Sequence, residues 1–458
     1  MTTTWASRLA SWLLQSFAGP IPEPVLERAA VHLFDTVSCA AGAHDSDAVA
    51  AALGAIAGSG PPLATLWFRQ AKAAPGDAVL VNGTAARFLD ANDVFLGQGP
   101  GGHPSDNIPV AVAAAEASGA SGRDLLAAVA LSYDLVARMR SLIFRTSRRG
   151  PDWHEVSISG PVGAAVVALL AGADHDELAN AISIGAARGY SLKEIRRGQI
   201  SMLKAAANAM VAREGVLAAQ LAHNGFSGPP QVFEGASGLV QTFGGEPDAA
   251  TIDALCAPPD WVITDASIKP FPAFGTSQAA LSAAVSLAAE GIDATEIEAI
   301  EIRLPDTAWT REYVGLEERQ APTTRGTADH SIQFLVSVAI VDGELTQRQY
   351  EEERWLDDDV TTLMARSSVV ADEALTEHAV RAFPATVVVR LAGGGFAEQT
   401  VLRTPGSPEN PWSWPEVAAK FARLDRSGIG PPRMEAIADA TRRLAGSADV
   451  AALAESLR

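Results

Sequence analysis

The stretch Ile-Glu-Ala-Ile-Glu-Ile-Arg-Leu at 297–304 is the point at which the sequence pattern changes from helical to strand-like. In its second half, apolar and charged residues alternate, which is typical of a half-buried strand. Two further strands are predicted at 385–391 and 396–402, joined in a hairpin by a run of three glycines. Helices are expected close to these strands, at 277–290 and 331–341. The chain around this stretch is therefore predicted to form a small α+β domain.

On the N-terminal side of this stretch, the chain reads as one helix after another. Apolar residues recur at helical spacing in 24–41 and 205–224, and Ser121 and Asp174 each open a further helix with a capping pattern. On the C-terminal side, the Pro- and Ser-rich 405–414 reads as a linker, after which helices return. The predicted fold class is mainly α with a smaller α+β domain. The expected division is 1–264 with 405–458 for the large helical domain, and 265–404 for the smaller one.

Composition excludes several classes of protein. Of the 458 residues, 48% are hydrophobic and 19% charged, too apolar for a disordered chain and long enough for two domains. With 35 basic and 54 acidic residues, the net charge is −19, so neither a nucleic acid nor a membrane surface is an expected partner. Two cysteines are too few for a disulfide framework, an iron–sulfur cluster or a Cys-rich zinc site. Without a recognisable targeting or bilayer-spanning segment, we expect a soluble, cytoplasmic protein.

The stretch FLDANDVFLGQGPGGHPSDN at 88–107 carries the densest set of polar candidates. It places Asp90 and Asp93 three residues apart at the end of an apolar helix. A Gly-rich loop follows, and then His103 stands just before an Ala/Val-rich helix. A histidine beside carboxylates is suited to proton transfer.

The N-terminus of the helix after His103 is a candidate anion site, and two other interpretations of this stretch stay open. We expect Asp106 or Ser105 to cap it, and its N-terminus would attract an anion. One alternative is an ordinary helix–loop–helix. The other is a divalent-ion site built from Asp90, Asp93 and His103, which no dense carboxylate cluster or histidine pair supports. No metal and no other cofactor is predicted.

Other polar residues stand at places where a ligand would explain them. Lys204 begins an Ala-rich helix, where the helix dipole disfavours a cation, and the backbone around Lys269 is stiffened by the two prolines that follow it at the domain change. His154 precedes an apolar helix, Arg197 lies in the segment leading to Lys204, and His330 precedes another helix. Ordinary alternatives stay open: a packing histidine, a surface lysine, a stiff linker or a helix cap.

The order of these motifs resembles the MmgE/PrpD family over nearly the whole chain. The resemblance implies a large helical domain completed by the C-terminus, a smaller lid domain and a homodimer. It also implies an interdomain cleft that binds a polycarboxylate without a metal or an iron–sulfur cluster. The motifs that carry it are Asp90…Asp93…His103-Pro-Ser-Asp-Asn107, Gly198-Gln-Ile-Ser-Met-Leu-Lys204, Gly228…Val232-Phe-Glu-Gly235, Ile268-Lys-Pro-Phe-Pro272 and Asp329-His-Ser331.

With this resemblance, we expect a hydro-lyase similar to 2-methylcitrate dehydratase, acting on a small hydroxy-polycarboxylate. Lysines would neutralise substrate carboxylates, His103 with Asp90 would remove a proton next to a carboxylate, and His154 would protonate the leaving hydroxyl. The expected catalytic residues are Asp90, His103, His154 and Lys204, and the expected substrate-binding residues are Asp93, Arg197, Lys269 and His330.

Two alternatives for the function stay open. One is a decarboxylase or epimerase of the same family acting on another organic acid, and the other is a non-catalytic carboxylate-binding protein. Phe274 and Phe334 stand where some family decarboxylases have histidine and tyrosine. Their side chains argue against cis-aconitate decarboxylation and predict a more apolar pocket.

Overall fold

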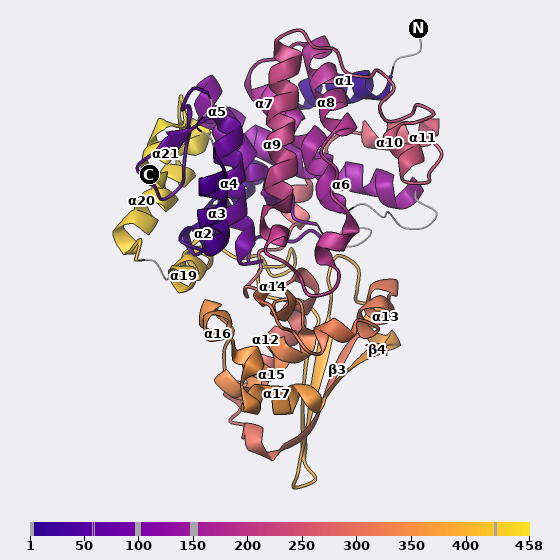
Figure 1. The fold of residues 1–458 in the computed structure, drawn as a ribbon, viewed down its shortest axis with the longest axis vertical. Coiled ribbons are helices and arrows are strands. Elements are labelled where there is room, and N and C mark those ends of the chain that lie inside the picture. Colours follow the sequence, from indigo (N-terminus) through magenta and orange to yellow (C-terminus); the bar gives the residue numbers. More distant parts are fainter. Residues whose placement is uncertain (1–3, 57, 59, 97–101, 147–153, 426–427) are drawn as a thin grey trace.

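A computed structural model describes residues 4–56, 58, 60–96, 102–146, 154–425 and 428–458 (Figure 1). Most of the Gly-rich loop expected after Asp93 lies outside these described residues. The described chain forms a large helical part and a smaller part that contains a sheet, which confirms the predicted fold class. No described helix combines the length and the apolar character needed to cross a bilayer.

The large part is built from helices that pack unusually close to one another. Glycines permit this: a Cβ added at Gly215 would lie 2.5 Å from the carbonyl oxygen of Gly160, and one added at Gly160 would lie 2.8 Å from that of Gly185. These glycines lie on the central helices α7, α8 and α9. The helices of this part are α1 Trp5–Ala18, α2 Glu23–Ala41, α3 Asp47–Ala55, α4 Pro75–Phe88, α5 Ile108–Ser118, α6 Gly122–Thr146, α7 Ser159–Leu170, α8 His175–Ala187, α9 Leu203–His223, α10 Leu239–Thr242 and α11 Ala249–Leu255.

The predicted capping residues open their helices as expected. The Ser121 hydroxyl accepts a hydrogen bond from the amide of Asp124 at 3.1 Å, and the Asp174 carboxylate accepts one from the amide of Glu177 at 2.9 Å. A short antiparallel pair, β1 Ala64–Thr65 and β2 Lys72–Ala73, was not predicted.

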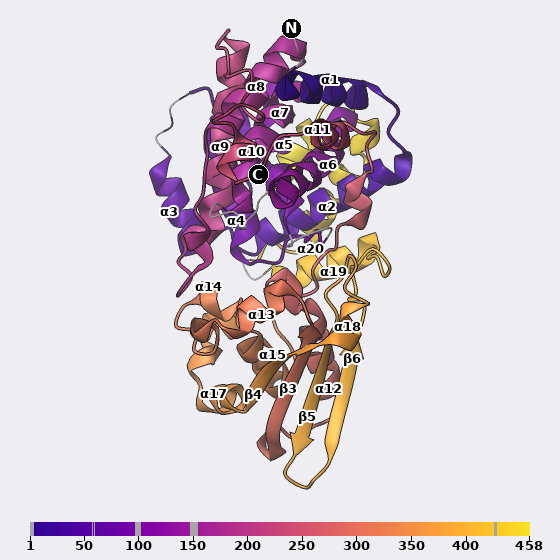
Figure 2. The same ribbon diagram turned by 90° about the vertical axis from the view of Figure 1, so that its right-hand side faces the viewer.

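The smaller part, which we call the lid, is a four-stranded sheet covered by helices α12 and α15 (Figure 2). The strand order is β4-β3-β5-β6, with β4 parallel to β3 and the other pairs antiparallel. The core of the lid is formed by alternate residues of β3 and β5 against α12 and α15. The elements are α12 Gln278–Ala289, β3 Ile297–Pro305, α13 Ala308–Val314, α14 Arg325–Ala328, α15 Ile332–Asp342, α16 Gln347–Glu351, α17 Asp358–Ala365, β4 Ser367–Asp372, α18 Glu373–Thr376, β5 Ala385–Leu391 and β6 Phe396–Val401.

Three of the four lid strands were predicted, and β4 was missed. None of its six residues is fully buried, and the sequence Ser-Ser-Val-Val-Ala-Asp lacks the alternation that identified β3.

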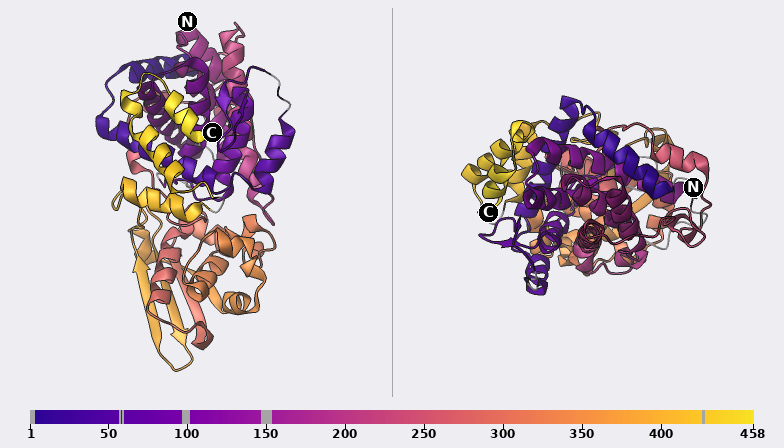
Figure 3. Two further views of the ribbon diagram at one scale, coloured as in Figure 1. Left: turned by 90° about the vertical axis from the view of Figure 1, so that its left-hand side faces the viewer. Right: turned by 90° about the horizontal axis from the view of Figure 1, so that it is seen from above.

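The C-terminal helices return to the large part, where α19 lies next to the lid (Figures 1 and 3). These helices are α19 Trp414–Leu424, α20 Pro431–Arg442 and α21 Ala451–Leu457. Phe421 on α19 packs against Phe34 on α2, with 5.4 Å between the ring centroids. Both residues belong to one hydrophobic core with residues of α4, α5 and α6. The end of the chain therefore helps to fix α2 and α4, which lead to the seam with the lid.

Candidate active site

The carboxylate of Asp90 lies at the centre of a buried cluster of charges at the seam between the two parts. Oδ1 lies 2.8 Å from Arg87 Nη1 and 2.5 Å from Lys269 Nζ, and Oδ2 lies 2.8 Å from Lys204 Nζ. Asp90 directly follows the end of α4 and has a positive φ of 52°, which turns its side chain toward these cations. Burial alone would raise the pKa of Asp90, but the three cations hold it well below its usual value.

The ammonium of Lys204 joins Asp90 to the lid. Lys204 is the second residue of α9 and is buried, and its Nζ lies 2.7 and 2.9 Å from the carboxylate oxygens of Asp329 and 3.2 Å from Nδ1 of His330. Asp90, Asp329 and His330 would also suit a divalent cation by their grouping. The lysine ammonium already lies among these three groups, so a metal ion would have to displace it. We call Arg87, Asp90, Lys204, Lys269 and Asp329 the charge cluster.

Lys269 is the most enclosed cation of the charge cluster. Besides Oδ1 of Asp90, its Nζ donates to the backbone oxygens of Asp90 at 2.6 Å and of Ala273 at 3.2 Å. Burial lowers the pKa of Lys269 to about 8, although Asp90 opposes this effect. Lys269 was expected to bind substrate, but its ammonium is surrounded by protein acceptors. In this arrangement it fixes Asp90 to the start of the lid.

His103 presents a nitrogen lone pair beside the charge cluster. Its Nδ1 lies 2.6 Å from the backbone oxygen of Asp93, so Nδ1–H donates there and Nε2 carries the lone pair. The pKa of His103 is lowered well below its usual value by burial, then by the positive charges of Arg87 and Lys269. A neutral imidazole with an Nε2 lone pair is a suitable proton acceptor.

Asp93 was expected to bind substrate. Its backbone oxygen instead accepts a hydrogen bond from His103, and its carboxylate faces Ser105 and His32. Oδ1 accepts a hydrogen bond of 2.5 Å from the Ser105 hydroxyl, and Oδ2 lies 3.6 Å from Nδ1 of His32. Burial raises the pKa of Asp93 to about 6. The structure thus gives Asp93 contacts with Ser105 and His32 within the large part, and no described contact with the lysines.

The expected cap of α5 is wrong. Neither Ser105 nor Asp106 caps this helix: Ser105 bonds to Asp93, and Asp106 Oδ1 accepts from the Asn92 amide at 3.1 Å. A 3₁₀ turn at Pro104–Asn107 precedes α5, and its N-cap residue Asn107 makes no side-chain capping bond. Ser105 and Asp106 bond to Asp93 and Asn92 instead of capping α5, because buried polar groups need hydrogen-bond partners.

Two more histidines meet at an arginine that the sequence analysis did not select. Nε of Arg196 donates to Nε2 of His154 at 2.6 Å, and Nη1 of Arg196 lies 3.4 Å from Nε2 of His330. Arg197, which was expected to bind substrate, pairs instead with Glu312 at the exposed surface. Arg196 ends a short 3₁₀ turn and Arg197 follows it in extended backbone, where periodicity cannot tell which arginine points inward.

Sequence reasoning also missed Arg87 and Lys420, and it quoted Asp329 within a motif without selecting it as a site residue. Lys420 on α19 is buried, and its Nζ lies 2.6 Å from both Asp35 Oδ1 and the backbone oxygen of Ala91. One usable signal existed for Arg87, because an arginine three residues before Asp90 in an otherwise Ala-rich helix requires a buried partner. The contact of Lys420 spans more than 300 residues of chain and had no local signal.

A cavity of about 500 Å³ opens at the seam and reaches the charge cluster at Lys204 and Asp329. Its wall includes Arg325, whose guanidinium carbon lies 4.4 Å from the ring centroid of Phe88 and 4.8 Å from that of Tyr350. Nη1 of Arg325 also donates to the backbone oxygen of Phe88 at 2.8 Å, so this lid residue is hydrogen-bonded to the large part.

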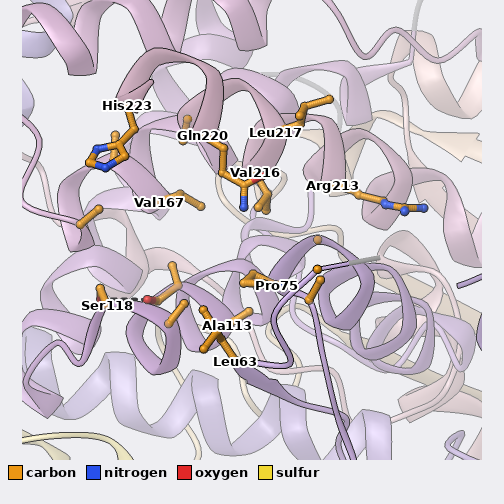
Figure 4. Close-up of a pocket in the computed structure, with 18 of the residues that line it drawn as sticks. Leu63, Pro75, Ala113, Ser118, Val167, Arg213, Val216, Leu217, Gln220 and His223 are labelled. Atoms are coloured by element: carbon orange, nitrogen blue, oxygen red, sulfur yellow. Dashed lines mark hydrogen bonds between the residues drawn. The ribbon is translucent and has the colours of Figure 1, made fainter. Parts of the chain in front are cut away.

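A second cavity, of about 630 Å³, lies within the large part between α4, α5, α7 and α9 (Figure 4). Apolar residues such as Val167, Val216 and Leu217 line most of it. Arg213 at one end is paired with Asp77 at 2.6 Å. None of its lining residues belongs to the charge cluster, so we place the chemistry at the seam.

Comparisons with known proteins agree on one family. The family model of the MmgE/PrpD N-terminal domain matches residues 7–251, and that of the MmgE/PrpD C-terminal domain matches residues 271–444. The chain is 24% identical to a cis-aconitate decarboxylase-like protein of Aspergillus oryzae, over 98% of this chain and 96% of that protein. It is 28% identical to 2-methylcitrate dehydratase of Cupriavidus necator, over 72% of this chain and 70% of the relative. It is 27% identical to human cis-aconitate decarboxylase, over 61% and 58% of the two chains.

Proposed function

The chain belongs to the MmgE/PrpD family, and from this premise we propose that it is a hydro-lyase acting on a small hydroxy-polycarboxylate. Its relatives include 2-methylcitrate dehydratases and cis-aconitate decarboxylases. Both names describe lyases that act on an organic acid. The proposed reaction is similar to that of 2-methylcitrate dehydratase and begins with removal of a proton next to a carboxylate.

The balance of charge in the cluster supports an anionic substrate. Three cations, Arg87, Lys204 and Lys269, face two carboxylates, Asp90 and Asp329. The neighbouring carboxyl of Asp106 adds only partial negative charge near neutral pH, because burial raises its pKa to about 7. A local excess of positive charge in a protein of net charge −19 attracts a polycarboxylate to this place.

The observation that carries the proposal is the orientation of His103, whose Nδ1 is held at 2.6 Å by the backbone oxygen of Asp93, three residues after Asp90. Its Nε2 lone pair can accept the proton from the carbon next to a substrate carboxylate. The negative charge that develops on that carboxylate is stabilised by Lys204, the cation of the charge cluster that lines the seam cavity. The bond to the hydroxyl then breaks, and the hydroxyl takes a proton and leaves as water.

His154 was expected to supply that second proton, and its contact restricts this role. While Nε of Arg196 donates to Nε2 of His154, this nitrogen carries a lone pair and no proton. In the proposed reaction, His154 therefore protonates the hydroxyl only after Arg196 has released Nε2 and this nitrogen has taken up a proton from solvent.

A product analysis in deuterated water tests the proposal. The protein is incubated with 2-methylcitrate and, separately, with cis-aconitate, and the products are followed by NMR. Conversion of 2-methylcitrate to an unsaturated acid, abolished in His103→Gln, would support dehydration. Release of carbon dioxide from cis-aconitate would favour decarboxylation, and deuterium uptake without loss of water would favour epimerisation. Binding without any conversion would contradict an enzymatic role.

Decarboxylation is the second candidate, because the similarity to the Aspergillus oryzae protein spans nearly the whole chain. Against it, Phe274 stacks on His330 with 5.0 Å between centroids, so an apolar ring lies where some decarboxylases have histidine. Phe334 does not bear on the pocket, contrary to expectation. It is buried in the lid core, with ring centroids 6.1 Å from Tyr350 and 6.0 Å from Trp355.

We also propose that the protein is a homodimer, as the family resemblance implies. Leu203, Met210 and Leu217 repeat every seven residues along α9 and are each about half exposed, at 46%, 49% and 47%. A two-fold contact would bring the same apolar face of two copies together and cover it. Light scattering during gel filtration should give twice the mass of the chain, and Met210→Lys should shift it toward the monomer.

A further inference from the structure

We propose that Arg196 is a positioning residue that holds His154 and His330 as neutral rings across the domain seam, each with its lone pair on Nε2. The inference rests on the proposed function of this site. It assigns a role to the arginine at the end of a 3₁₀ turn, Lys193–Arg196, which lies between α8 and α9.

The side chain of Arg196 connects one histidine from each part of the molecule. His154 belongs to the large part, where it precedes a 3₁₀ turn and its backbone amide donates to the oxygen of Ser191 at 2.7 Å. His330 belongs to the lid. The Arg196 guanidinium lies 2.6 Å from Nε2 of His154 and 3.4 Å from Nε2 of His330. One planar group thus sets the separation of two imidazoles that arise from separate domains.

The chemistry of a guanidinium fixes the state of both rings. Arginine only donates hydrogen bonds and keeps its charge at any physiological pH, so each nitrogen that faces it must carry a lone pair. For His330, the ammonium of Lys204 lies 3.2 Å from Nδ1 and would need a lone pair there, but the carboxylate oxygen Oδ1 of Asp329 lies closer, at 2.5 Å, and can only accept, so we assign the proton to Nδ1. The rings are therefore neutral, with the proton on Nδ1.

For His154, two of the contacts with described residues compete. The amide of Val156 lies 3.3 Å from Nδ1, which would make that nitrogen an acceptor too, and a neutral imidazole has only one acceptor nitrogen. The Arg196 bond is 0.7 Å shorter and comes from a charged donor, so we assign the lone pair to Nε2.

The backbone of Arg196 also meets the lid, since its oxygen accepts from Nη2 of Arg319 at 2.8 Å. A side-chain variant leaves this bond in place. Substitution of Arg196 therefore changes the contacts of the two histidines while one tie between the lid and the segment persists.

The test compares Arg196→Gln and Arg196→Lys with a matched control, Arg197→Gln. Arg197 is the next residue, and its pair with Glu312 is exposed. The protein is labelled with ¹⁵N at histidine, and the ring nitrogens are followed by NMR near neutral pH without substrate. His154→Gln and His330→Gln identify the two sets of signals. We expect the wild type to show an Nδ1–H form for both rings.

In Arg196→Gln, we expect the His154 ring to change to a mixture of the two neutral forms, with kcat at least tenfold lower and a smaller change in KM. Arg196→Lys keeps the charge but offers one compact donor in place of a fork, so it should rescue one ring at most. Arg197→Gln should leave both the spectra and kcat unchanged.

Unchanged ring signals of His154 and His330 in Arg196→Gln would overturn the inference, as would an equal effect of Arg197→Gln. If Arg196→Gln does not fold by circular dichroism, Arg196→Lys supplies the same comparison. Because the ring signals are measured without substrate, they decide the inference even if the proposed dehydration is refuted by the product analysis.

Discussion

Replacing Asp90 by asparagine should destabilise the protein strongly, because three buried cations share this one carboxylate. Asparagine keeps the size of the side chain and tolerates the positive φ of 52° at this position, so the change removes charge with little backbone strain. The effect on the free energy of unfolding therefore reports the electrostatic role of Asp90.

The size of the effect follows from the contacts. Removing one partner of a buried ion pair costs about 3–5 kcal/mol, because the other charge is left buried without compensation. Lys204 keeps Asp329 at 2.7 Å, but Lys269 keeps only backbone oxygens besides Asp90 among its described contacts. We expect Asp90→Asn to lower the free energy of unfolding by about 3–5 kcal/mol at pH 7.

The pH dependence has a definite sign. The folded-state pKa of Asp90 lies well below its unfolded value, so its stabilising contribution is fully present above the unfolded pKa of about 4. It is lost as pH falls through the depressed folded pKa. The difference in stability between wild type and Asp90→Asn should therefore be constant between pH 5 and 7 and shrink in stronger acid.

Urea unfolding followed by circular dichroism measures this difference. The control is Asp306→Asn, which breaks the exposed pair with Arg311 and should cost under about 1 kcal/mol. The double variant with Lys269→Met removes one orphaned cation and should recover about 1–3 kcal/mol relative to additive losses. If Asp90→Asn costs no more than Asp306→Asn, the charge cluster does not stabilise the seam as argued.

Three further outcomes are expected. His103→Gln should reduce turnover on the order of a hundredfold or more while substrate binding by calorimetry persists; near-normal turnover would remove His103 from the proposed reaction. The folded-state pKa of Asp106 is raised to about 7, so the native state binds the extra proton between about pH 4 and 7, and the free energy of unfolding should fall as pH rises through this range. Asp106→Asn should flatten that fall in urea titrations at pH 5 and 8, and an unchanged slope would argue against the shift. Treatment with a strong chelator should leave turnover unchanged, because the Lys204 ammonium lies among the grouped ligands; loss of activity restored by a divalent ion would contradict this.

Much of the fold could be predicted from local patterns. The helix of α2, the capping of α6 and α8, and the strands β3, β5 and β6 all follow from periodicity and capping residues, which act within a few residues of chain. The edge strand β4 and the 3₁₀ turn before α5 could not be predicted in this way. Both depend on partners from elsewhere, β3 for the first and the buried Asp93 and Asn92 for the second.

For the candidate site, the sequence indicated which segments carry chemistry but not which atoms meet. Asp90, Lys204 and Lys269 were expected to lie in one site, and both lysine ammonium groups contact the Asp90 carboxylate. Their charges, however, are satisfied by one another and by Asp329, and the expected free lysines for substrate are not what the described contacts show. Which of two adjacent arginines faces the histidines depends on the path of the backbone between α8 and α9.

The amino-acid sequence by itself determined the helical and strand segments, the change of character near residue 297, and the family, because these depend on short-range spacing and on the order of motifs. Only the tertiary structure decided that Arg87 and Asp329 complete the charge cluster, that Asp93 serves His103 through its backbone, and that Arg196 rather than Arg197 lies between two histidines. The physical reason is that these contacts do not depend on separation along the chain. Burial and Coulomb interactions act between groups that folding brings within about 3 Å of one another.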